Sequence, residues 1–361
     1  MKIIDVKIEY ISVPLNRPFK TALRTVNSVE DVIVKVITDC GNIGFGEAPP
    51  TAVITGDTTG AIVSAINDVI KKTIIGMKIE NFEELMIKLN KCMVNNTSAK
   101  AAVDIALYDL YGQLYNAPLY KLLGGYRKQI TTDITISVND PIEMSQDSLE
   151  AVRLGYKTLK IKVGKEANLD IKRLQKIREV IGPDIKVRID ANQGWTPKEA
   201  VKILRRMEDL GLDIELVEQP VKAHDFEGLK FVSDNVYIPV MADESVFSPM
   251  DALIIMQMRA ADLINIKLMK TGGIHNALKI CSMAEIYGVK CMIGCMLEAK
   301  VSVTAAAHLA AAKSIITKVD LDGPVLCKED PIIGGAIFKG NTIILCDAPG
   351  LGITGVVCND H

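Results

Sequence analysis

The sequence predicts an α/β protein in which a closed parallel (β/α) barrel follows a smaller α+β domain. From about residue 130 onward, short apolar strands alternate with amphipathic helices, which is typical of a parallel sheet covered by helices. The first 60 residues or so instead alternate apolar and polar side chains, as antiparallel strands do. The chain has 361 residues, more than one hydrophobic core usually spans, so we expect a second domain.

The N-terminal segment predicts antiparallel sheet followed by helices. The runs MKIIDVKIEYISVPL and VEDVIVKVITD alternate in polarity, and DCGNIG after the second run predicts a turn. The glycines of this turn do not form a dinucleotide-binding motif, because no helix opens after them. From about residue 61 to 115 the apolar residues follow a helical period, and Gly124-Gly125 end this unit.

Eight candidate strands alternate with helices in the following segment, which favours a closed barrel over an open doubly wound sheet. Several helices carry start signals: Thr196-Pro197-Lys198-Glu199 predicts a capping box, and Ser248-Pro249 opens another helix in the same way. The last 40 residues or so lack this alternation, and we expect them to pack back on the N-terminal domain. The candidate strands are 131–138, 158–163, 186–191, 214–219, 238–244, 261–267, 289–294 and 316–322.

Charge and composition exclude several classes of protein. Lys and Arg number 42 against 44 Asp and Glu, a net charge of −2, which suits neither nucleic acid nor an anionic membrane as a partner. The longest run without charged residues, 301–312, is shorter than the ~20 apolar residues of a membrane span. Eight single Cys and an N-terminus without a signal-peptide core lead us to expect a cytoplasmic protein with reduced thiols.

Acidic residues end three successive candidate strands. A parallel barrel strand is buried on both faces, so charged residues within it need an explanation. Asp190, Glu218 and Asp243 all lie at the carboxyl ends of their strands, the face on which barrel enzymes build their sites. Adjacent strands lie ~4.8 Å apart, so the three carboxylates can converge, and together they would require a cation. An all-oxygen ligand set without His or Cys predicts Mg²⁺.

Lysines at the same ends predict proton transfer. Lys160 and Lys162 are two residues apart and point to the same side of their strand, whereas Lys267 comes from the sixth strand, roughly opposite the second. A lysine on each face of a carbon next to a metal-bound carboxylate can remove a proton from one face and return one to the other. The pattern therefore predicts a racemase or an epimerase. We expect Lys270, in the KTGG loop, to be solvated.

These motifs resemble a known family over essentially the whole chain. LKIKVG, IDANQGW, LVEQP, MADES and INIKLMKTGGI, in this order and spacing, are similar to the muconate-lactonizing subgroup of the enolase superfamily, whose sites use a Lys or His base with Mg²⁺. The resemblance implies a modified (β/α)7β barrel with an N-terminal α+β capping domain completed by the C-terminal tail. It implies Asp190, Glu218 and Asp243 as Mg²⁺ ligands.

The same resemblance implies roles for the lysines and boundaries for the parts of the chain. Lys162 and Lys267 would be the two acid/base residues, and Lys160 would contact the substrate carboxylate. We expect a capping domain over 1–125, a catalytic barrel over 126–322 and a returning segment over 323–361.

The substrate is expected to be a dipeptide. Asp320 and Asp322 on the last strand offer two carboxylates away from the metal cluster, which suits a ligand ammonium and resembles the marker of dipeptide epimerases. A dipeptide spans about 7 Å, enough to reach from this pair to the metal. The segment RPFKTALRTV (17–26) resembles the covering loop of L-Ala-D/L-Glu epimerases, with Arg24 pairing with an acidic second side chain and with Arg17 and Lys20 as alternatives.

The segment GCMLEAK (294–300) resembles the family segment at the seventh strand, so Glu298 is expected among the substrate-binding residues. Cys295 and Leu297 differ there from the commoner Ser and Ile, which bears on the shape of the pocket for the N-terminal residue. The subgroup also implies metabolism of peptides from peptidoglycan.

Other readings stay open. N-acylamino acid racemase, cycloisomerase and o-succinylbenzoate synthase belong to the same subgroup, although the Asp pair argues against the last two, whose substrates have no ammonium. A Schiff-base aldolase would also place a lysine at a barrel strand end, and a non-catalytic binding barrel is the remaining alternative. The sequence fixes neither the physiological dipeptide nor the oligomeric state, and a homo-oligomer is possible.

Overall fold

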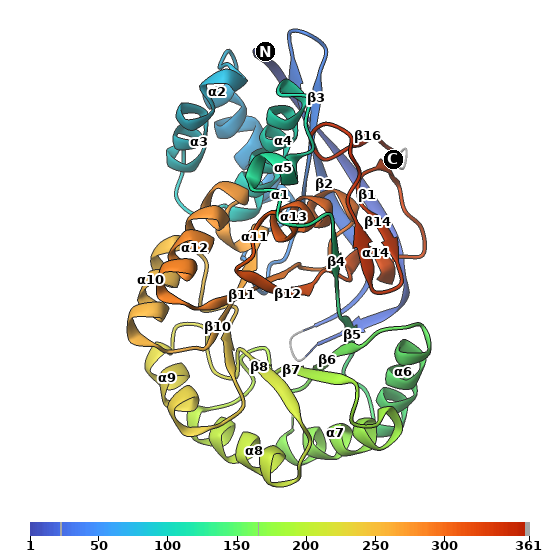
Figure 1. The fold of residues 1–361 in the computed structure, drawn as a ribbon. Helices are drawn as coiled ribbons and strands as arrows, with labels where there is room; N and C mark the ends of the chain where they lie inside the picture. Colours follow the sequence, from blue (N-terminus) through green and yellow to red (C-terminus); the bar gives the residue numbers. More distant parts are fainter. Residues whose placement is uncertain (22–23, 165, 358–361) are drawn as a thin grey trace.

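The computed structural model describes residues 1–21, 24–164 and 166–357. The chain begins with an antiparallel sheet of β1 (Ile3–Lys20), β2 (Thr25–Thr38) and β3 (Ile43–Ala48), as the alternating polarity predicts. Helices follow, the longest of which, α4, lies against β3 (Figure 1). The helical elements of this part are α1 (Thr59–Ser64), a π-helical turn (Ala65–Ile70), α2 (Lys71–Ile74), a 3₁₀ turn (Ile79–Asn81), α3 (Phe82–Lys91), α4 (Thr97–Leu114) and α5 (Leu119–Leu123).

The glycines of β3 explain how α4 lies so close to the sheet. A Cβ atom at Gly44 would lie 2.1 Å from the carbonyl oxygen of Ala106, and one at Gly46 would lie 1.8 Å from that of Ala102. Only glycine permits this approach of backbone to backbone. The glycines that superficially suggest a phosphate-binding loop therefore serve helix packing.

Eight parallel strands form the barrel, in the hydrogen-bonded order β12-β11-β10-β9-β8-β7-β6-β5. The two ends of this order meet where Asp133 N donates to Val319 O at 3.3 Å, so the sheet is a nearly closed barrel. All eight strands fall within the predicted segments. They are β5 (Ile134–Ile136), β6 (Thr158–Lys162), β7 (Lys186–Asp190), β8 (Ile214–Glu218), β9 (Val240–Ala242), β10 (Leu263–Lys267), β11 (Lys290–Gly294) and β12 (Ile316–Asp320).

Helices alternate with these strands, so the described elements follow the (β/α)7β order that the sequence implies (Figure 1). Thr196 caps α8 through a capping box with Glu199, and Ser248 caps α10 before Pro249. The barrel helices are α6 (Pro141–Arg153), α7 (Ala167–Ile181), α8 (Pro197–Asp209), α9 (Phe226–Asn235), α10 (Pro249–Met258), the short α11 (Leu268–Thr271), α12 (Ile274–Tyr287) and α13 (Lys300–Ala312).

The C-terminal segment returns to the N-terminal elements. After α14 (Gly323–Leu326), the strands β14 (Ile337–Lys339) and β15 (Thr342–Ile344) extend β4 (Gln129–Thr131) into a small sheet, and β13 (Ile332–Gly334) pairs with β16 (Ile353–Val356). Leu351 N donates to Asp109 of α4 at 2.8 Å, and Leu119 N donates to Gly350 O at 2.9 Å. The expected packing of the tail on the N-terminal part is confirmed by these contacts.

None of the helices in the described part of the chain is long and apolar enough to cross a membrane.

Candidate active site

A cavity of about 600 Å³ lies at the carboxyl ends of the barrel strands and opens to solvent. Its size is that of a site for a small ligand. Lys160, Lys162, Lys267, Asp320 and Asp322, all predicted from the sequence, line it. The remaining lining residues come from β1 and the segment between β1 and β2, from the segment after β3, from β5, from the loops after β7 and β11, and from α14: Phe19, Thr21, Arg24, Thr51, Val53, Ile54, Thr135, Asn192, Cys295, Met296, Leu297 and Leu326.

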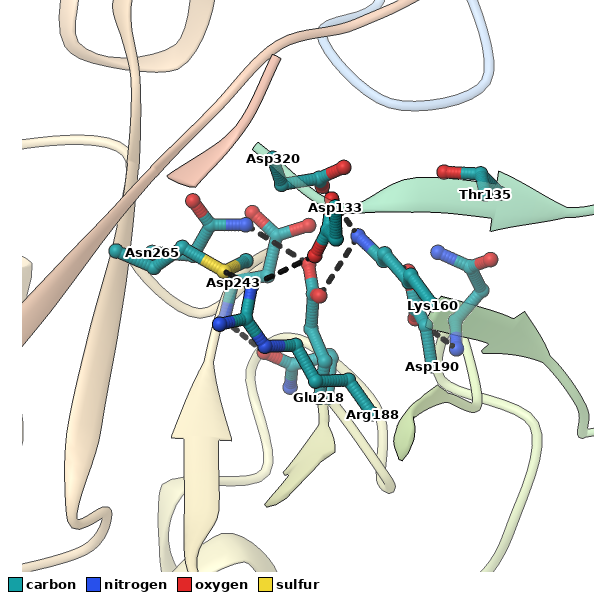
Figure 2. Close-up of polar contacts among 12 residues, drawn as sticks. Asp133, Thr135, Lys160, Arg188, Asp190, Glu218, Asp243, Asn265 and Asp320 are labelled. Atoms are coloured by element: carbon teal, nitrogen blue, oxygen red, sulfur yellow. Dashed lines mark hydrogen bonds and ion pairs between the residues drawn. The ribbon is translucent and has the colours of Figure 1, made fainter. Parts of the chain in front are cut away.

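The three predicted metal ligands form a buried row beneath this cavity. Asp190 and Glu218 are Cα partners on the neighbouring strands β7 and β8, and Asp243 directly follows β9. All three are at most 1% exposed. Lys160 Nζ lies 3.2 Å from Asp190 Oδ2 and 2.7 Å from Glu218 Oε2, so one ammonium group bridges two of the carboxylates (Figure 2). The register of three adjacent strands thus brings the predicted acids together.

The donor set of this row suits a divalent cation, although lysines now contact its carboxylates. Among the described residues, no group of three or more His, Cys, Asp or Glu side chains is arranged as a metal site as it stands, because lysine ammonium groups occupy the positions next to the carboxylates. Glu218 Oε2 and Asp243 Oδ1 are both buried, and each lies against a lysine ammonium group, Lys160 Nζ at 2.7 Å and Lys270 Nζ at 2.5 Å. Buried carboxylate oxygens that attract cations, in an all-oxygen set without His or Cys, fit Mg²⁺ in chemistry.

Electrostatics in the row follow from burial and from the lysines. Burial alone would raise the pKa of Asp190, but the ammonium groups of Lys162 and Lys160 hold it at about 2. Burial and the charge of Asp190 raise the pKa of Glu218 to about 8, because Glu218 has less compensation from lysines. Because Glu218 resists ionisation in this row, an additional cation next to it would be bound favourably.

Lys162 and Lys267 lie at opposite ends of the carboxylate row. Lys162 Nζ is 2.6 Å from Asp190 Oδ2, and Lys267 Nζ is 2.7 Å from Asp243 Oδ2 and 4.0 Å from Glu218 Oε1. Both side chains line the cavity and are 6% exposed. Burial lowers the pKa of Lys267, but the contact with Asp243 outweighs burial and raises it. A lysine acts as a base near neutral pH only when its pKa falls, so a cation bound at Asp243 would have to cancel this attraction.

The prediction that Lys270 is solvated is wrong. Lys270 is fully buried, with Nζ 2.5 Å from Asp243 Oδ1 and 3.1 Å from the carbonyl oxygen of Asn265, to which it donates. The short helix α11 turns this residue back under the end of β9. The sequence signal was available, since a lysine three residues after Lys267 faces the same side of a helical turn.

Asp320 ends β12, Asp322 follows two residues later just before α14, and both line the cavity. Asp320 Oδ2 lies 2.7 Å from Lys160 Nζ (Figure 2). Asp322 Oδ2 accepts the backbone N–H of Thr135 at 2.7 Å. Lys160 therefore links the pair to Glu218, so the Asp pair is less remote from the carboxylate row than the sequence suggests. Burial and the charge of Asp320 raise the pKa of Asp322 to about 6, an environment that favours a cationic ligand.

The three basic residues of the predicted covering segment (17–26) have different surroundings. Arg24 lines the cavity, and burial lowers the pKa of its guanidinium. Arg17 instead forms ion pairs with Asp147 and Glu150 of α6, the latter at 2.9 Å, and Lys20 donates to Asn139 at 2.7 Å. Residues 22 and 23 of this segment lie outside the described residues. Of the three, Arg24 alone is placed to reach a ligand in the described cavity.

Glu298 is not among the cavity-lining residues, contrary to expectation. Its carboxyl group accepts the N–H of Met296 at 2.6 Å and contacts the hydroxyl of Ser302. These local bonds turn the side chain toward α13 and the N-terminal sheet. The neighbouring residues Cys295 and Leu297 do line the cavity, so the deviation from the family pattern at these positions bears on the shape of the pocket.

Sequence reasoning missed three polar residues of the site. Asn265 Nδ2 donates to Glu218 Oε1 at 2.8 Å and thus orients that carboxylate (Figure 2). Asn192 and Thr135 line the cavity. The asparagine within the apolar run INIK was a usable signal, because an amide inside a barrel needs a buried partner. Thr135 offers no such signal, since threonine is common in strands.

Two family models match the chain. "Mandelate racemase / muconate lactonizing enzyme, N-terminal domain" matches residues 3–124, and "Enolase C-terminal domain-like" matches residues 143–355. An L-Ala-D/L-Glu epimerase of Clostridium acetobutylicum is 68% identical over 99% of both chains.

Solved structures agree with this relationship. The substrate-liganded complex of the L-Ala-D/L-Glu epimerase from Bacillus subtilis superimposes with a TM-score of 0.98 at 52% identity, covering 99% of each chain. A dipeptide epimerase from Enterococcus faecalis, complexed with Mg and the dipeptide L-Leu-L-Tyr, gives a TM-score of 0.95 at 46% identity, covering 98% of this chain and all of the other. The chain therefore belongs to the mandelate racemase/muconate lactonizing enzyme family of the enolase superfamily.

Proposed function

We propose that this protein is a Mg²⁺-dependent dipeptide epimerase that inverts the α-carbon of the C-terminal residue, with L-Ala-D/L-Glu or a related dipeptide as its substrate. One observation carries the proposal: the amines of Lys162 and Lys267 contact opposite ends of one buried carboxylate row, and both line the cavity. Amines on the two flanks of a bound carbon acid suit inversion of configuration. The names of the similar proteins, which are epimerases of L-Ala-D/L-Glu and of hydrophobic dipeptides, support the same reaction.

The proton transfer balances within the two lysines. The neutral amine of one lysine takes the α-proton, and the electron pair of the broken C–H bond passes to the substrate carboxylate as an enolate. The ammonium group of the other lysine then gives a proton to the opposite face and re-forms the C–H bond. The two lysines have exchanged charge states, so the next turnover of that enzyme molecule runs in the reverse direction or follows proton exchange with water.

The remaining residues of the site hold the two ends of the dipeptide. Bound Mg²⁺, held by Asp190, Glu218 and Asp243, would supply positive charge beside the substrate carboxylate. Lys160 is buried next to Asp190 and Glu218 and adds a second cation for that end. At the other end, Asp320 and Asp322 would bind the ammonium group, and Arg24 would pair with an acidic second side chain.

Other features extend the proposal. We place the protein in the cytoplasm, acting on small peptides derived from peptidoglycan, without nucleic acid or membrane partners. We divide the chain into a capping domain over 1–125, a catalytic barrel over 126–322 and a returning segment over 323–361. The backbone contacts of the returning segment with α4 and α5 support this division.

A dipeptide library incubated in D₂O tests the reaction. We expect deuterium at the α-carbon of the C-terminal residue, together with formation of the second diastereomer. Deuterium incorporation should be highest for L-Ala-L-Glu. Chelation should abolish the exchange and Mg²⁺ should restore it. Activity that survives chelation, or trapping of the substrate by borohydride, would favour a Schiff-base enzyme instead.

An N-acetylated dipeptide separates this reaction from its nearest alternative. The Asp320/Asp322 pair is suited to an ammonium group, so capping the amine should remove most of the activity. Equal or better turnover of the N-acetyl form would identify an N-acylamino acid racemase.

A further inference from the structure

A cluster of three buried carboxyl groups lies outside the catalytic row, where the N-terminal sheet meets the barrel. Asp31 of β2, Glu47 of β3 and Glu298, just before α13, are at most 2% exposed. Ala299 N donates to Asp31 Oδ2 at 2.9 Å and to Glu47 Oε1 at 3.0 Å, which brings these two acids to the same backbone group. Among the described residues, no lysine or arginine forms an ion pair with any of the three acids.

The hydrogen bonds of this cluster are best satisfied when one of its carboxyl groups holds a proton. Ser302 Oγ lies 3.0 Å from Glu47 Oε2 and also contacts Glu298 Oε2, yet its hydroxyl has only one hydrogen to donate. Glu47 already accepts the N–H groups of Ala299 and Ser302, so it is the member best suited to carry the negative charge. The second contact is satisfied when Glu298 is a neutral acid that donates to Ser302, which in turn donates to Glu47.

The cluster is joined to the wall of the cavity. Glu298 Oε1 accepts the N–H of Met296 at 2.6 Å, and Met296 lines the cavity together with its neighbours Cys295 and Leu297. On the other side, the backbone of Glu298 packs against Gly323, where a Cβ atom would lie 2.6 Å from the carbonyl oxygen of Glu298. Gly323 directly follows Asp322. A change at Glu298 would therefore reach both the apolar wall and the Asp pair.

We propose that Glu298 is a positioning residue and not a substrate ligand: as a neutral acid it connects the cavity wall 295–297, through Ser302, to Glu47 of the N-terminal sheet. Loss of its proton places a second negative charge beside Glu47, breaks the link to Ser302 and loosens this wall, so that substrate binding weakens at alkaline pH while proton transfer between the lysines continues. The inference deepens the proposed function, on which it rests for the choice of substrate.

The surroundings of the cluster support a change of charge near neutral pH. Burial raises the pKa of Glu298 to about 7, against the opposing hydrogen bonds of Ser302 and Met296. Burial and the neighbouring Glu47 raise the pKa of Asp31 well above its usual range. The other titratable groups that face the cluster are Cys327, after α14, which faces Asp31 and Glu47, and Cys295 and Lys267, which face Glu298. None of these groups forms an ion pair with the three acids in the described structure.

The test compares the Mg²⁺-loaded protein with Glu298→Gln, Glu298→Ala and Ser302→Ala. An amide at 298 accepts the N–H of Met296 and donates to Ser302 at every pH, so it mimics the neutral acid. In the unmodified protein we expect the KM for L-Ala-L-Glu to rise about fivefold between pH 7 and pH 9, equivalent to one lost hydrogen bond. We expect Glu298→Gln to remove this rise. We expect Glu298→Ala and Ser302→Ala to raise KM already at pH 7, with kcat changed less than KM in these two variants.

Asp109→Asn is the matched control, because Asp109 is an equally buried carboxyl group that accepts backbone N–H groups far from the cavity wall. It should leave the pH dependence of KM as in the unmodified protein. Titration of the substrate ammonium affects every variant alike, so it cancels in the comparison. A rise in KM that persists in Glu298→Gln, or one that is absent from the unmodified protein, overturns the proposal.

A second measurement does not depend on turnover. Thermal unfolding of the Mg²⁺-loaded protein should lose more stability between pH 6 and pH 9 than that of Glu298→Gln, because only the acid has a proton to lose. If the unfolding curves differ in this way but no dipeptide is epimerised, the proposed function is refuted and the protonated link at Glu298 still holds. Identical unfolding curves at all pH values would refute the link itself.

Discussion

The two lysines at the ends of the carboxylate row make distinct predictions at the scale of a single residue. Lys162→Ala and Lys267→Ala should each lower epimerisation at least about a thousandfold, because inversion needs a donor on the face opposite to the base. Each variant should still exchange the α-proton of one diastereomer with D₂O, and the two variants should act on opposite diastereomers. Exchange of both diastereomers by either variant would contradict the assignment of one lysine to each face.

Arg24 gives a second residue-scale prediction, on specificity. If its guanidinium pairs with the acidic side chain of the substrate, Arg24→Ala should raise the KM for L-Ala-L-Glu about tenfold to a hundredfold, the effect of one charge-assisted hydrogen bond or ion pair. L-Ala-L-Ala should be affected little. Arg17→Ala is the matched control, because Arg17 is engaged with Asp147 and Glu150 outside the cavity. Steady-state kinetics on the two dipeptides would show an equal loss if Arg24 only supports the fold.

At the scale of the element, the carboxyl end of β12 determines which end of the substrate is recognised. Asp322→Asn keeps an oxygen to accept the N–H of Thr135, so this hydrogen bond is retained while a charge is removed. We expect kcat/KM for L-Ala-L-Glu to fall about a hundredfold and the preference over the N-acetyl form to shrink to a few fold. Asp330→Asn, which removes a surface ion pair with Lys300, should change neither value. If Asp322→Asn prefers the free dipeptide over the N-acetyl form as strongly as the unmodified protein does, the substrate ammonium group binds elsewhere.

The elements themselves were largely predictable, for a physical reason. All eight barrel strands lie within the predicted segments because a buried parallel strand is a short apolar run between turn signals, and the capping box at Thr196 is a local hydrogen-bonding pattern. Lys270 shows where such reasoning fails. The neighbouring residues in the sequence predict that this loop lysine is exposed to solvent. The short helix α11 instead buries it against Asp243, which is distant in sequence and adjacent only in the fold.

At the scale of the whole molecule, the site depends on which residues the barrel brings together. The one-per-strand placement of Asp190, Glu218 and Asp243 was visible in sequence because parallel strands align their carboxyl ends. The cluster of Asp31, Glu47 and Glu298 was not visible, since its members come from the N-terminal sheet and from the loop after β11. Glu298 shows that a family-like motif fixes the position of a residue along the chain but not the direction of its side chain.

Buried acids that join the parts of the molecule also predict how its stability varies with pH. Asp104 of α4 accepts the first N–H groups of α12, and Asp109 of the same helix accepts those of Phe45 and Leu351. Burial raises the pKa of Asp104 to about 8 and that of Asp109 to about 7. The folded state therefore binds protons between pH 4 and pH 8 that the unfolded chain, with a pKa of about 4 for Asp, has already released.

The sign follows from this difference in proton binding. Each group contributes stability that is fully present below the unfolded pKa and is lost as the pH rises toward the folded pKa, at about 1.4 kcal/mol per pH unit and per group. We expect the free energy of unfolding, measured by urea denaturation with Mg²⁺ present, to be lower at pH 9 than at pH 6. Asp109→Asn, which cannot lose a proton, should reduce this difference, whereas Asp330→Asn at the surface should leave it unchanged. Equal stability at the two pH values would mean that these acids are ionised throughout, stabilised by the backbone N–H groups that bind them.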